Sequence, residues 1–189
     1  MRIIAGKYRG RKLKSPPSLE MRPTSDRLRE TLFNVISPRI KGARFLDLCA
    51  GSGAVGIEAL SRVAEQVTFV DRSRKMCGLI EANLDLCRIT DGEVAVVTAD
   101  AFDFLRKAVK RQLGTWDIIF YDPPYSEDYL AVLEALGSSA SELLSPEGLL
   151  VIEHHHKTEL PGETGALIRR RVLKQGESAL SFYSRAESW

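Results

Sequence analysis

Short runs of apolar residues alternate with longer segments of mixed character from residue 43 onward. The short runs are rich in Val, Ile, Leu and Phe, as expected of strands that are buried on both faces of a sheet. The longer segments repeat apolar residues at helical spacing. Strands that alternate with helices in this way predict a parallel sheet covered on both faces. The expected strands are 43–49, 66–70, 94–98, 116–121 and 149–153, and the expected helices are 54–64, 75–88, 102–113 and 127–143.

The N-terminal segment departs from this rhythm. Residues 1–14 carry short apolar stretches beside glycines and many basic residues, which is typical of a small basic β-hairpin. A helix is expected near 26–37, with Thr24 or Ser25 as its cap and Pro38 as its end. We therefore expect a hairpin arm in residues 1–20 and a main domain in residues 21–189.

The C-terminal segment predicts two further strands, 165–174 and 178–186, separated by Gln-Gly-Glu. They are expected to close the sheet as an antiparallel pair. Together with the earlier runs they predict an α/β fold with a mostly parallel sheet of seven strands and helices on both faces.

Size and composition exclude several classes of protein. The 189 residues, 44% of them hydrophobic and 28% charged, suit one globular domain. The three cysteines lack the spacing of a zinc site, and their odd number argues against a disulfide scaffold. No apolar run is long enough to span a membrane, and the basic N-terminus is unlike a secretory signal. We expect a cytoplasmic protein with no membrane partner.

Charge is distributed unevenly along the chain. Residues 1–44 hold 12 Lys and Arg against 3 Asp and Glu, whereas the remainder holds 15 against 22. A basic arm on an acidic body favours a polyanionic partner such as a nucleic acid. We expect six arm cations to contact RNA phosphates: Arg2, Lys7, Arg9, Arg11, Lys12 and Lys14.

Candidate chemistry lies after the expected strands, where open parallel sheets bind their ligands. Gly51-Ser-Gly53 follows the first strand, and such glycines let a backbone approach a ligand closely. Asp47 lies inside this apolar strand, so its carboxylate needs a ligand cation or backbone donors. Asp71 ends the second strand, 20 residues after Gly51, where it can accept both hydroxyls of a ribose or cap the next helix.

Two further strand ends carry polar residues. Asp100 can accept from the amine of an adenine, and it serves equally well as a helix cap. Asp122-Pro-Pro-Tyr125 is the most specific segment, because two prolines remove N–H donors and leave a rigid set of acceptors. Tyr125 adds a ring on which a base can stack. These features suit a planar base that bears an amine.

These residues resemble a known class of enzyme in order and spacing. Asp47-Leu-Cys-Ala-Gly-Ser-Gly, Asp71, Asp100-Ala101 and Asp122-Pro-Pro-Tyr are similar to the class I S-adenosylmethionine-dependent methyltransferases with an (Asn/Asp)-Pro-Pro-(Tyr/Phe) motif. The segments that begin Arg2-Ile-Ile-Ala-Gly-Lys and Arg22-Pro-Thr-Ser-Asp-Arg resemble the RsmD family. That family comprises bacterial enzymes that methylate N2 of one guanine in 16S ribosomal RNA.

The resemblance covers nearly the whole chain and implies a Rossmann-like fold, S-adenosylmethionine as cofactor, and 16S rRNA or an assembling 30S subunit as partner. In the substrate site, Asp122 and the Pro123 carbonyl would accept from the target amine, and Tyr125 would stack on the flipped guanine. The residues implied for the cofactor are Asp47, Gly51, Gly53, Arg22 and Thr24 at its methionine part, Asp71 at its ribose, and Asp100 and Ala101 at its adenine.

Three alternatives stay open at this point. The Pro-Pro-Tyr segment also serves N6-adenine methyltransferases, which the methylated nucleoside distinguishes. A nicotinamide dehydrogenase would use the glycine turn but leave Asp122-Pro-Pro-Tyr125 unexplained. A non-catalytic RNA-binding module would show no methyl transfer.

The remaining conspicuous residues are predicted to have no role in catalysis or metal binding. His154-His-His156 would point to alternating faces of a strand, so no metal site is expected. Arg169-Arg-Arg171 is interpreted as a solvated strand end, and Asn83 as part of helix packing. A monomer is expected.

Overall fold

The predicted apolar runs form the centre of one sheet in a computed structural model, which describes residues 1–16, 25–89, 94–124, 129–138 and 142–185. The strand order is β3-β2-β1-β4-β5-β8-β7-β6. The strands from β3 to β5 are parallel, and the last three run antiparallel. The strands are β1 (Arg44–Leu48), β2 (Gln66–Asp71), β3 (Val94–Thr98), β4 (Trp116–Tyr121), β5 (Leu144–His155), β6 (Glu163–Thr164), β7 (Leu167–Gln175) and β8 (Ser178–Arg185).

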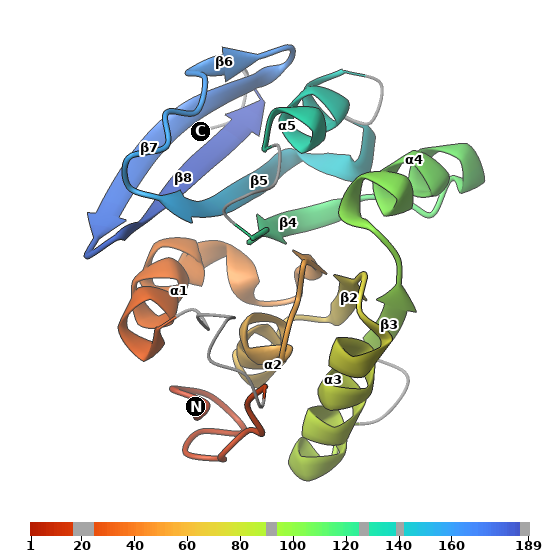
Figure 1. The fold of residues 1–189 in the computed structure, drawn as a ribbon, viewed down its shortest axis with the longest axis vertical. Coiled ribbons are helices and arrows are strands. Elements are labelled where there is room, and N and C mark those ends of the chain that lie inside the picture. The colour runs from red at the N-terminus through yellow and green to blue at the C-terminus, as the bar shows by residue number, and fades with distance from the viewer. Residues whose placement is uncertain (17–24, 90–93, 125–128, 139–141, 186–189) are drawn as a thin grey trace.

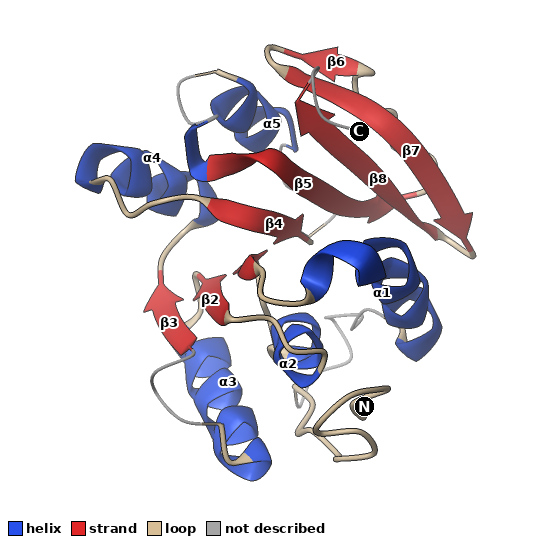
Figure 2. Cartoon of the chain, turned by 180° about the vertical axis from the view of Figure 1, so that it is seen from behind, coloured by secondary structure: helices blue, strands red, loops and turns tan. Residues whose placement is uncertain are grey.

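Helices cover both faces of this sheet, as Figure 1 shows. One face carries the N-terminal residues with α1 (Asp26–Ile40), α2 (Ala54–Ser61) and α3 (Arg74–Cys87). The other face carries α4 (Ala101–Arg111) and α5 (Tyr129–Gly137). The view from behind in Figure 2 shows the same two layers. The predicted α/β fold is confirmed, including its closing antiparallel pair.

The sheet departs from the prediction in two places. It has eight strands in the described part of the chain, because Glu163–Thr164 adds the short β6 to the edge of β7. Strand β5 begins at Leu144 rather than Leu149, and a register shift against β4 accommodates the residues before Leu149. Ser145-Pro-Glu-Gly interrupts the apolar run there, which is why the pattern did not predict a strand.

Helix α1 also differs from the prediction at its end. Ser25 caps it by accepting from the Leu28 N–H, as one of the two candidates was expected to do. However, the helix continues through Pro38 to Ile40. Pro38 removes one backbone hydrogen bond from the last turn, and burial of the Ile40 side chain favours the extra residues nevertheless.

The basic N-terminal arm, defined here as residues 1–14, folds back on itself with antiparallel backbone hydrogen bonds between residues 1–3 and 10–13, although the pairing is too short to form regular strands. One antiparallel bridge joins Arg2 and Lys12. Ile3, Tyr8 and Leu13 are buried in the same apolar cluster as α1 and α2. At Gly6 the arm lies so close to α2 that a Cβ would stand 1.8 Å from the Ser61 carbonyl oxygen. The arm is therefore packed onto the domain.

The order in which the strands are added to the sheet reverses between β1 and β4. From β1 the connections lead outward through β2 to β3, and then return to β4 on the other side of β1. The two helices that follow β1 and β4 thus lie on opposite faces of the sheet. Ligands of open α/β sheets bind at such a point, beyond the carboxyl ends of the strands.

Candidate functional site

Backbone hydrogen bonds hold the ends of β1, β2 and β4 together at one edge of the sheet. The Ala50 N–H donates to the Val70 carbonyl at 3.0 Å, and the Asp122 N–H donates to the Leu48 carbonyl at 3.3 Å. A third bond, from the Ala99 N–H to the Asp71 carbonyl, brings in the end of β3. The segments expected to carry the chemistry therefore meet at the switch point of the sheet.

The glycine turn after β1 leaves room for a ligand. Gly51 and Gly53 have φ angles of 54° and 77°, in the left-handed region that glycine adopts without strain. A Cβ at Gly51 would meet no atom within 4 Å, so this part of the backbone faces open space. Gly53 caps α2 without a side-chain hydrogen bond, and of the first three N–H groups of α2 only that of Gly56 is bound by a side chain, Asp47.

Gly56 has a different role from the other two glycines. A Cβ there would lie 2.3 Å from a ring carbon of Phe69 on β2. The third glycine of the turn therefore allows α2 to pack directly against the sheet, and it does not face a ligand.

Asp47 lies buried beneath this turn, with 2% of its surface exposed. Its Oδ2 accepts from the Gly56 N–H at 2.9 Å. Burial raises the pKa of this carboxyl from 3.8 to about 7, and the nearby Asp71 charge adds to the rise, whereas the Gly56 bond opposes it. The expected need for a backbone donor is met, and a cation near the turn would further favour the ionised carboxylate.

Asp71 closes the glycine turn from the end of β2. Its Oδ2 accepts from the Gly51 N–H at 2.9 Å, and its Oδ1 accepts from the Ser73 N–H at 2.8 Å. A carboxylate has about four acceptor positions, so each oxygen keeps the capacity to accept a further hydroxyl. The competing expectation that Asp71 caps α3 is not met, because Ser73 is the cap residue.

Asp100 is the N-cap of α4, as its alternative interpretation expected. One carboxylate oxygen, Oδ1, accepts from the N–H groups of Phe102 and Asp103. The cap fixes this carboxylate at the end of β3, next to the buried Ala101. A contact with an adenine stays a prediction.

The Asp122-Pro-Pro segment leaves β4 at the same edge. Asp122 is half-buried, Pro123 is buried and Pro124 is exposed. The Asp122 backbone is held to β1 by its bond to Leu48. Tyr125, Arg22 and Thr24 lie outside the described residues, so their expected contacts stay predictions.

All six cations of the arm are exposed, but they are not equivalent. Arg11 donates to the Leu86 carbonyl at 2.7 Å and lies over the Tyr8 ring. Lys7 also lies over that ring, with its Nζ 5.2 Å from the centroid. These two side chains therefore help to fix the arm. The other four cations of the arm are Arg2, Arg9, Lys12 and Lys14.

Buried polar side chains connect the arm to the domain, and sequence reasoning did not assign them this role. Glu58 is fully buried, and its carboxylate accepts from the Ile4 and Ala5 N–H groups at 2.7 and 3.0 Å. Arg29 is also fully buried and donates to the Arg2 carbonyl at 2.6 Å. An acidic residue inside the otherwise apolar sequence of α2 was the signal that could have revealed Glu58.

Asn83 does more than pack a helix. Its Nδ2 donates to the carbonyls of Ser52 and Lys14 at 2.9 and 3.1 Å, and its Oδ1 accepts from the Lys14 N–H at 2.8 Å. One buried amide thus joins the base of the arm to the glycine turn.

The histidine and arginine triplets lie on the antiparallel side of the sheet. His154 is buried, and its Nε2 forms a hydrogen bond with Ser181 Oγ at 2.9 Å. Burial lowers the pKa of His154. Within the described residues, no three His, Cys, Asp or Glu side chains are grouped to hold a metal. Arg169 and Arg170 donate to the carbonyls of Leu160 and Arg185, so they are tied to the sheet rather than simply solvated.

Comparison with known proteins agrees with this fold. A family model described as conserved hypothetical protein 95 matches residues 1–184. The chain belongs to this family. A putative rRNA methyltransferase, YlbH of Bacillus subtilis, is 40% identical over 98% of this chain and 99% of its own. The ribosomal RNA small subunit methyltransferase D of Escherichia coli is 38% identical over 98% of this chain and 90% of its own.

A solved structure superposes closely on this chain. A putative methyltransferase from Escherichia coli, yhhF, matches with a TM-score of 0.83 and 36% identity over 98% of this chain and 97% of that chain. The predicted resemblance to the RsmD methyltransferases is thereby confirmed. Within the residues described here, no helix is both long and apolar enough to cross a membrane.

Proposed function

We propose that this protein transfers a methyl group from S-adenosylmethionine to the N2 amine of a guanine in small-subunit ribosomal RNA. The observation that carries the proposal is the meeting of the Gly51–Gly53 turn and the Asp122-Pro-Pro segment at the switch point of the sheet. The small-subunit methyltransferase of Escherichia coli, similar over nearly the whole chain, supports small-subunit ribosomal RNA as the substrate class.

The residues at the turn fit this cofactor. Open space at Gly51 and the first two N–H groups of α2, which no side chain caps, suit a carboxylate that the helix dipole would stabilise. Asp47 and Asp71 supply the negative charge that a sulfonium and an ammonium group need nearby. Asp71 keeps acceptor capacity for two ribose hydroxyls, and Asp100 with Ala101 would meet the adenine at the end of β3. Arg22 and Thr24 are proposed to line the methionine end.

The Asp122-Pro123 segment is proposed to activate the target amine. The bound cofactor supplies an electrophilic methyl group. An exocyclic amine is a poor nucleophile because its lone pair is conjugated with the ring. Hydrogen bonds from this amine to the Asp122 carboxylate and the Pro123 carbonyl would favour a pyramidal nitrogen and stabilise the positive charge that develops on it. Tyr125 would stack on the flipped base.

Positioning supplies much of the expected rate. Fixing two reactants in line can lower a barrier by about 7–11 kcal/mol. The segments that would hold them are bonded to each other through Leu48 and Val70, so the acceptors and the turn keep a constant separation. No covalent enzyme intermediate is required.

The arm is proposed to bind the phosphates of the RNA, which is naked 16S rRNA or an assembling 30S particle. Its exposed cations, Arg2, Lys7, Arg9, Arg11, Lys12 and Lys14, lie on a segment without acidic residues. The affinity for RNA should therefore fall steeply with salt. We propose that the protein acts as a monomer in the cytoplasm.

The experiment that tests the function is identification of the methylated nucleoside. The protein is incubated with S-adenosylmethionine and unmethylated small-subunit RNA or particles, and the digested RNA is analysed by mass spectrometry. N2-methylguanosine is expected. N6-methyladenosine would keep the fold and overturn the substrate, and absence of any methylated nucleoside on both RNA forms would contradict the proposal.

A further inference from the structure

A hollow of about 490 Å³ lies between the arm and the first turn of α1. This volume is within the range of small-molecule sites and is large enough for one nucleotide. The arm contributes two arginines and no acid to this hollow, whereas α1 contributes one arginine and two acidic residues. The lining consists of Arg2, Ile3, Ile4, Arg9, Gly10, Asp26, Arg27 and Glu30.

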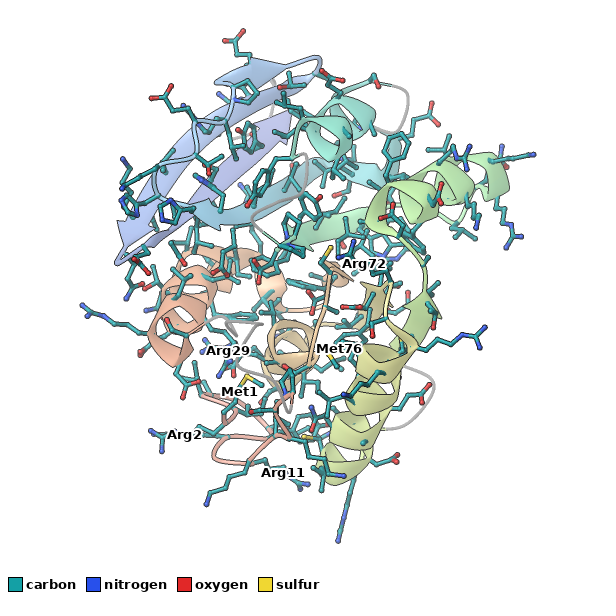
Figure 3. The ribbon with its side chains drawn as sticks, in the orientation of Figure 1. Met1, Arg2, Arg11, Arg29, Arg72 and Met76 are labelled. Carbon is teal, nitrogen blue, oxygen red and sulfur yellow. The ribbon has the colours of Figure 1, made fainter. Side chains whose placement is uncertain are left out.

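Arg29 ties the two sides of this hollow together. Its Nη2 donates to the Arg2 carbonyl at 2.6 Å and to Asp26 Oδ1 at 2.9 Å. Figure 3 shows the buried Arg29 side chain between α1 and the arm, near Met1 and Arg2. Because Glu58 also holds the N–H groups of Ile4 and Ala5, the arm side is fixed independently. The hollow is therefore built into the fold before any ligand arrives.

Three exposed guanidinium groups of the hollow are available to a ligand. The side chains of Arg2, Arg9 and Arg27 make no hydrogen bond or ion pair with any residue that the structure describes. By contrast, Arg11 and Arg62 are held by Leu86 and Glu58. Guanidinium groups bind phosphate oxygens through two parallel hydrogen bonds, so this arrangement suits a phosphate.

The two acidic residues of the hollow differ in whether a neighbouring cation offsets their charge. Asp26 is paired with the buried Arg29, which offsets its charge. The Glu30 side chain is exposed and forms no ion pair with the described residues, so its carboxylate opposes an anion in the hollow. Three guanidinium groups outweigh the one Glu30 carboxylate, so the charge of the hollow still favours a phosphodiester. Removal of the Glu30 charge should therefore strengthen RNA binding.

The hollow also lies beside the proposed catalytic edge. The Met1 sulfur is 3.8 Å from Ser52 Oγ in the glycine turn, and Arg2 follows Met1 directly. A strand of RNA held at Arg2 would thus run close to the turn that is proposed to hold the methyl donor.

We infer that this hollow binds a phosphodiester of the substrate RNA next to the target guanine, with Arg27 of α1 acting together with Arg2 and Arg9 of the arm. The inference rests on the proposed function and adds to it a contact outside the basic arm. It also separates the arm cations into two groups, since Arg11 is engaged in holding the arm.

The test compares RNA affinity across variants of the full chain at several salt concentrations. Arg27→Ala and Arg2→Ala should each weaken binding of small-subunit RNA by about 3- to 10-fold. Each should lower the salt slope by about 0.7 to 1, as expected for loss of one phosphate contact. Glu30→Gln should strengthen binding, which a merely structural role would not do. Arg111→Ala is the matched control, because Arg111 is exposed in the last turn of α4, at the opposite end of the strands.

Several outcomes would overturn the inference. If Arg27→Ala leaves both the affinity and the salt slope unchanged while Lys12→Ala weakens binding, RNA contacts the arm but not the hollow. If guanosine monophosphate binds in an Arg27-dependent way and RNA binding is insensitive to Arg27, the hollow takes free nucleotides instead. Because RNA binding is measured without turnover, failure of methyl transfer would count against the proposed function alone.

Discussion

The side-chain amide of Asn83 in α3 donates a hydrogen bond to the Ser52 carbonyl in the glycine turn, 2.9 Å away. The same amide holds both backbone groups of Lys14 at the base of the arm. The segment proposed to bind RNA and the turn proposed to bind the cofactor are thus fixed to one buried side chain. Their relative position is a property of the folded core and does not depend on a flexible tether.

Asn83→Ala should therefore destabilise the protein. The substitution leaves the buried Ser52 carbonyl and the two partly buried Lys14 groups without their partner, at a cost of about 2–4 kcal/mol. Denaturant unfolding measures the change. Asn34→Ala, at an exposed position of α1, is the control and should stay within about 0.5 kcal/mol of the unchanged protein. Equal effects of the two substitutions would mean that the amide contributes no more than a surface residue.

Two glycines should respond to alanine in opposite directions. Gly56→Ala places a Cβ 2.3 Å from the Phe69 ring, so it should lower the free energy of unfolding by about 1–3 kcal/mol. Gly78→Ala in α3 meets no atom within 4 Å and should raise it by about 0.5–1 kcal/mol, because alanine favours a helix interior. Thermal unfolding of both variants checks the pair, and a stable Gly56→Ala protein would show that α2 does not need its close contact with β2.

The raised pKa of Asp47 predicts a pH dependence of cofactor binding. With a pKa of about 7, the carboxyl is protonated at pH 6 and ionised at pH 8. If the ionised form attracts the ammonium group that S-adenosylhomocysteine shares with the cofactor, the Kd for S-adenosylhomocysteine should fall as pH rises from 6 to 8, by at most about tenfold per unit. Asp47→Asn should flatten this profile in calorimetric titrations. A profile that is the same in both proteins would remove Asp47 from this role.

The same carboxyl affects stability without ligand. The folded state binds the proton more tightly than the unfolded chain, whose pKa is near 3.8. Stability contributed by the protonated form is therefore complete below about pH 4 and is lost as pH rises toward 7. Asp47→Asn should accordingly gain stability relative to the unchanged protein between pH 5 and about 8.

The sequence predicted the strands most accurately where a strand is buried on both faces. Strands β1, β2 and β4 are covered on both faces, so their apolar runs predicted their positions closely. The start of β5 and the short β6 escaped prediction, because polar residues pair there through the backbone alone. Pro38 was expected to end α1, but tertiary burial of Ile40 outweighs the local preference.

The site was predictable in outline for a similar reason. Asp47, Gly51, Asp71 and Asp122 follow or end buried strands, and the sheet brings strand ends to one edge. The buried polar contacts that hold the arm and the glycine turn in place were not predictable. Asn83, Glu58 and Arg29 act through contacts with residues 27 to 69 positions away. A single sequence gives no pattern for such long-range polar contacts, apart from the unusual acid in α2.

The most direct test of the central claim is a single-turnover measurement of methyl transfer by Asp122→Ala on unmethylated small-subunit RNA. If Asp122 accepts from the target amine, the rate should fall by about 100- to 1,000-fold, as when one transition-state hydrogen bond is removed. The Kd for S-adenosylhomocysteine should change less than about threefold, because the glycine turn is untouched. Asp85→Ala, at an exposed position of α3, serves as the control. An unchanged rate in Asp122→Ala would contradict the account of how this site transfers a methyl group.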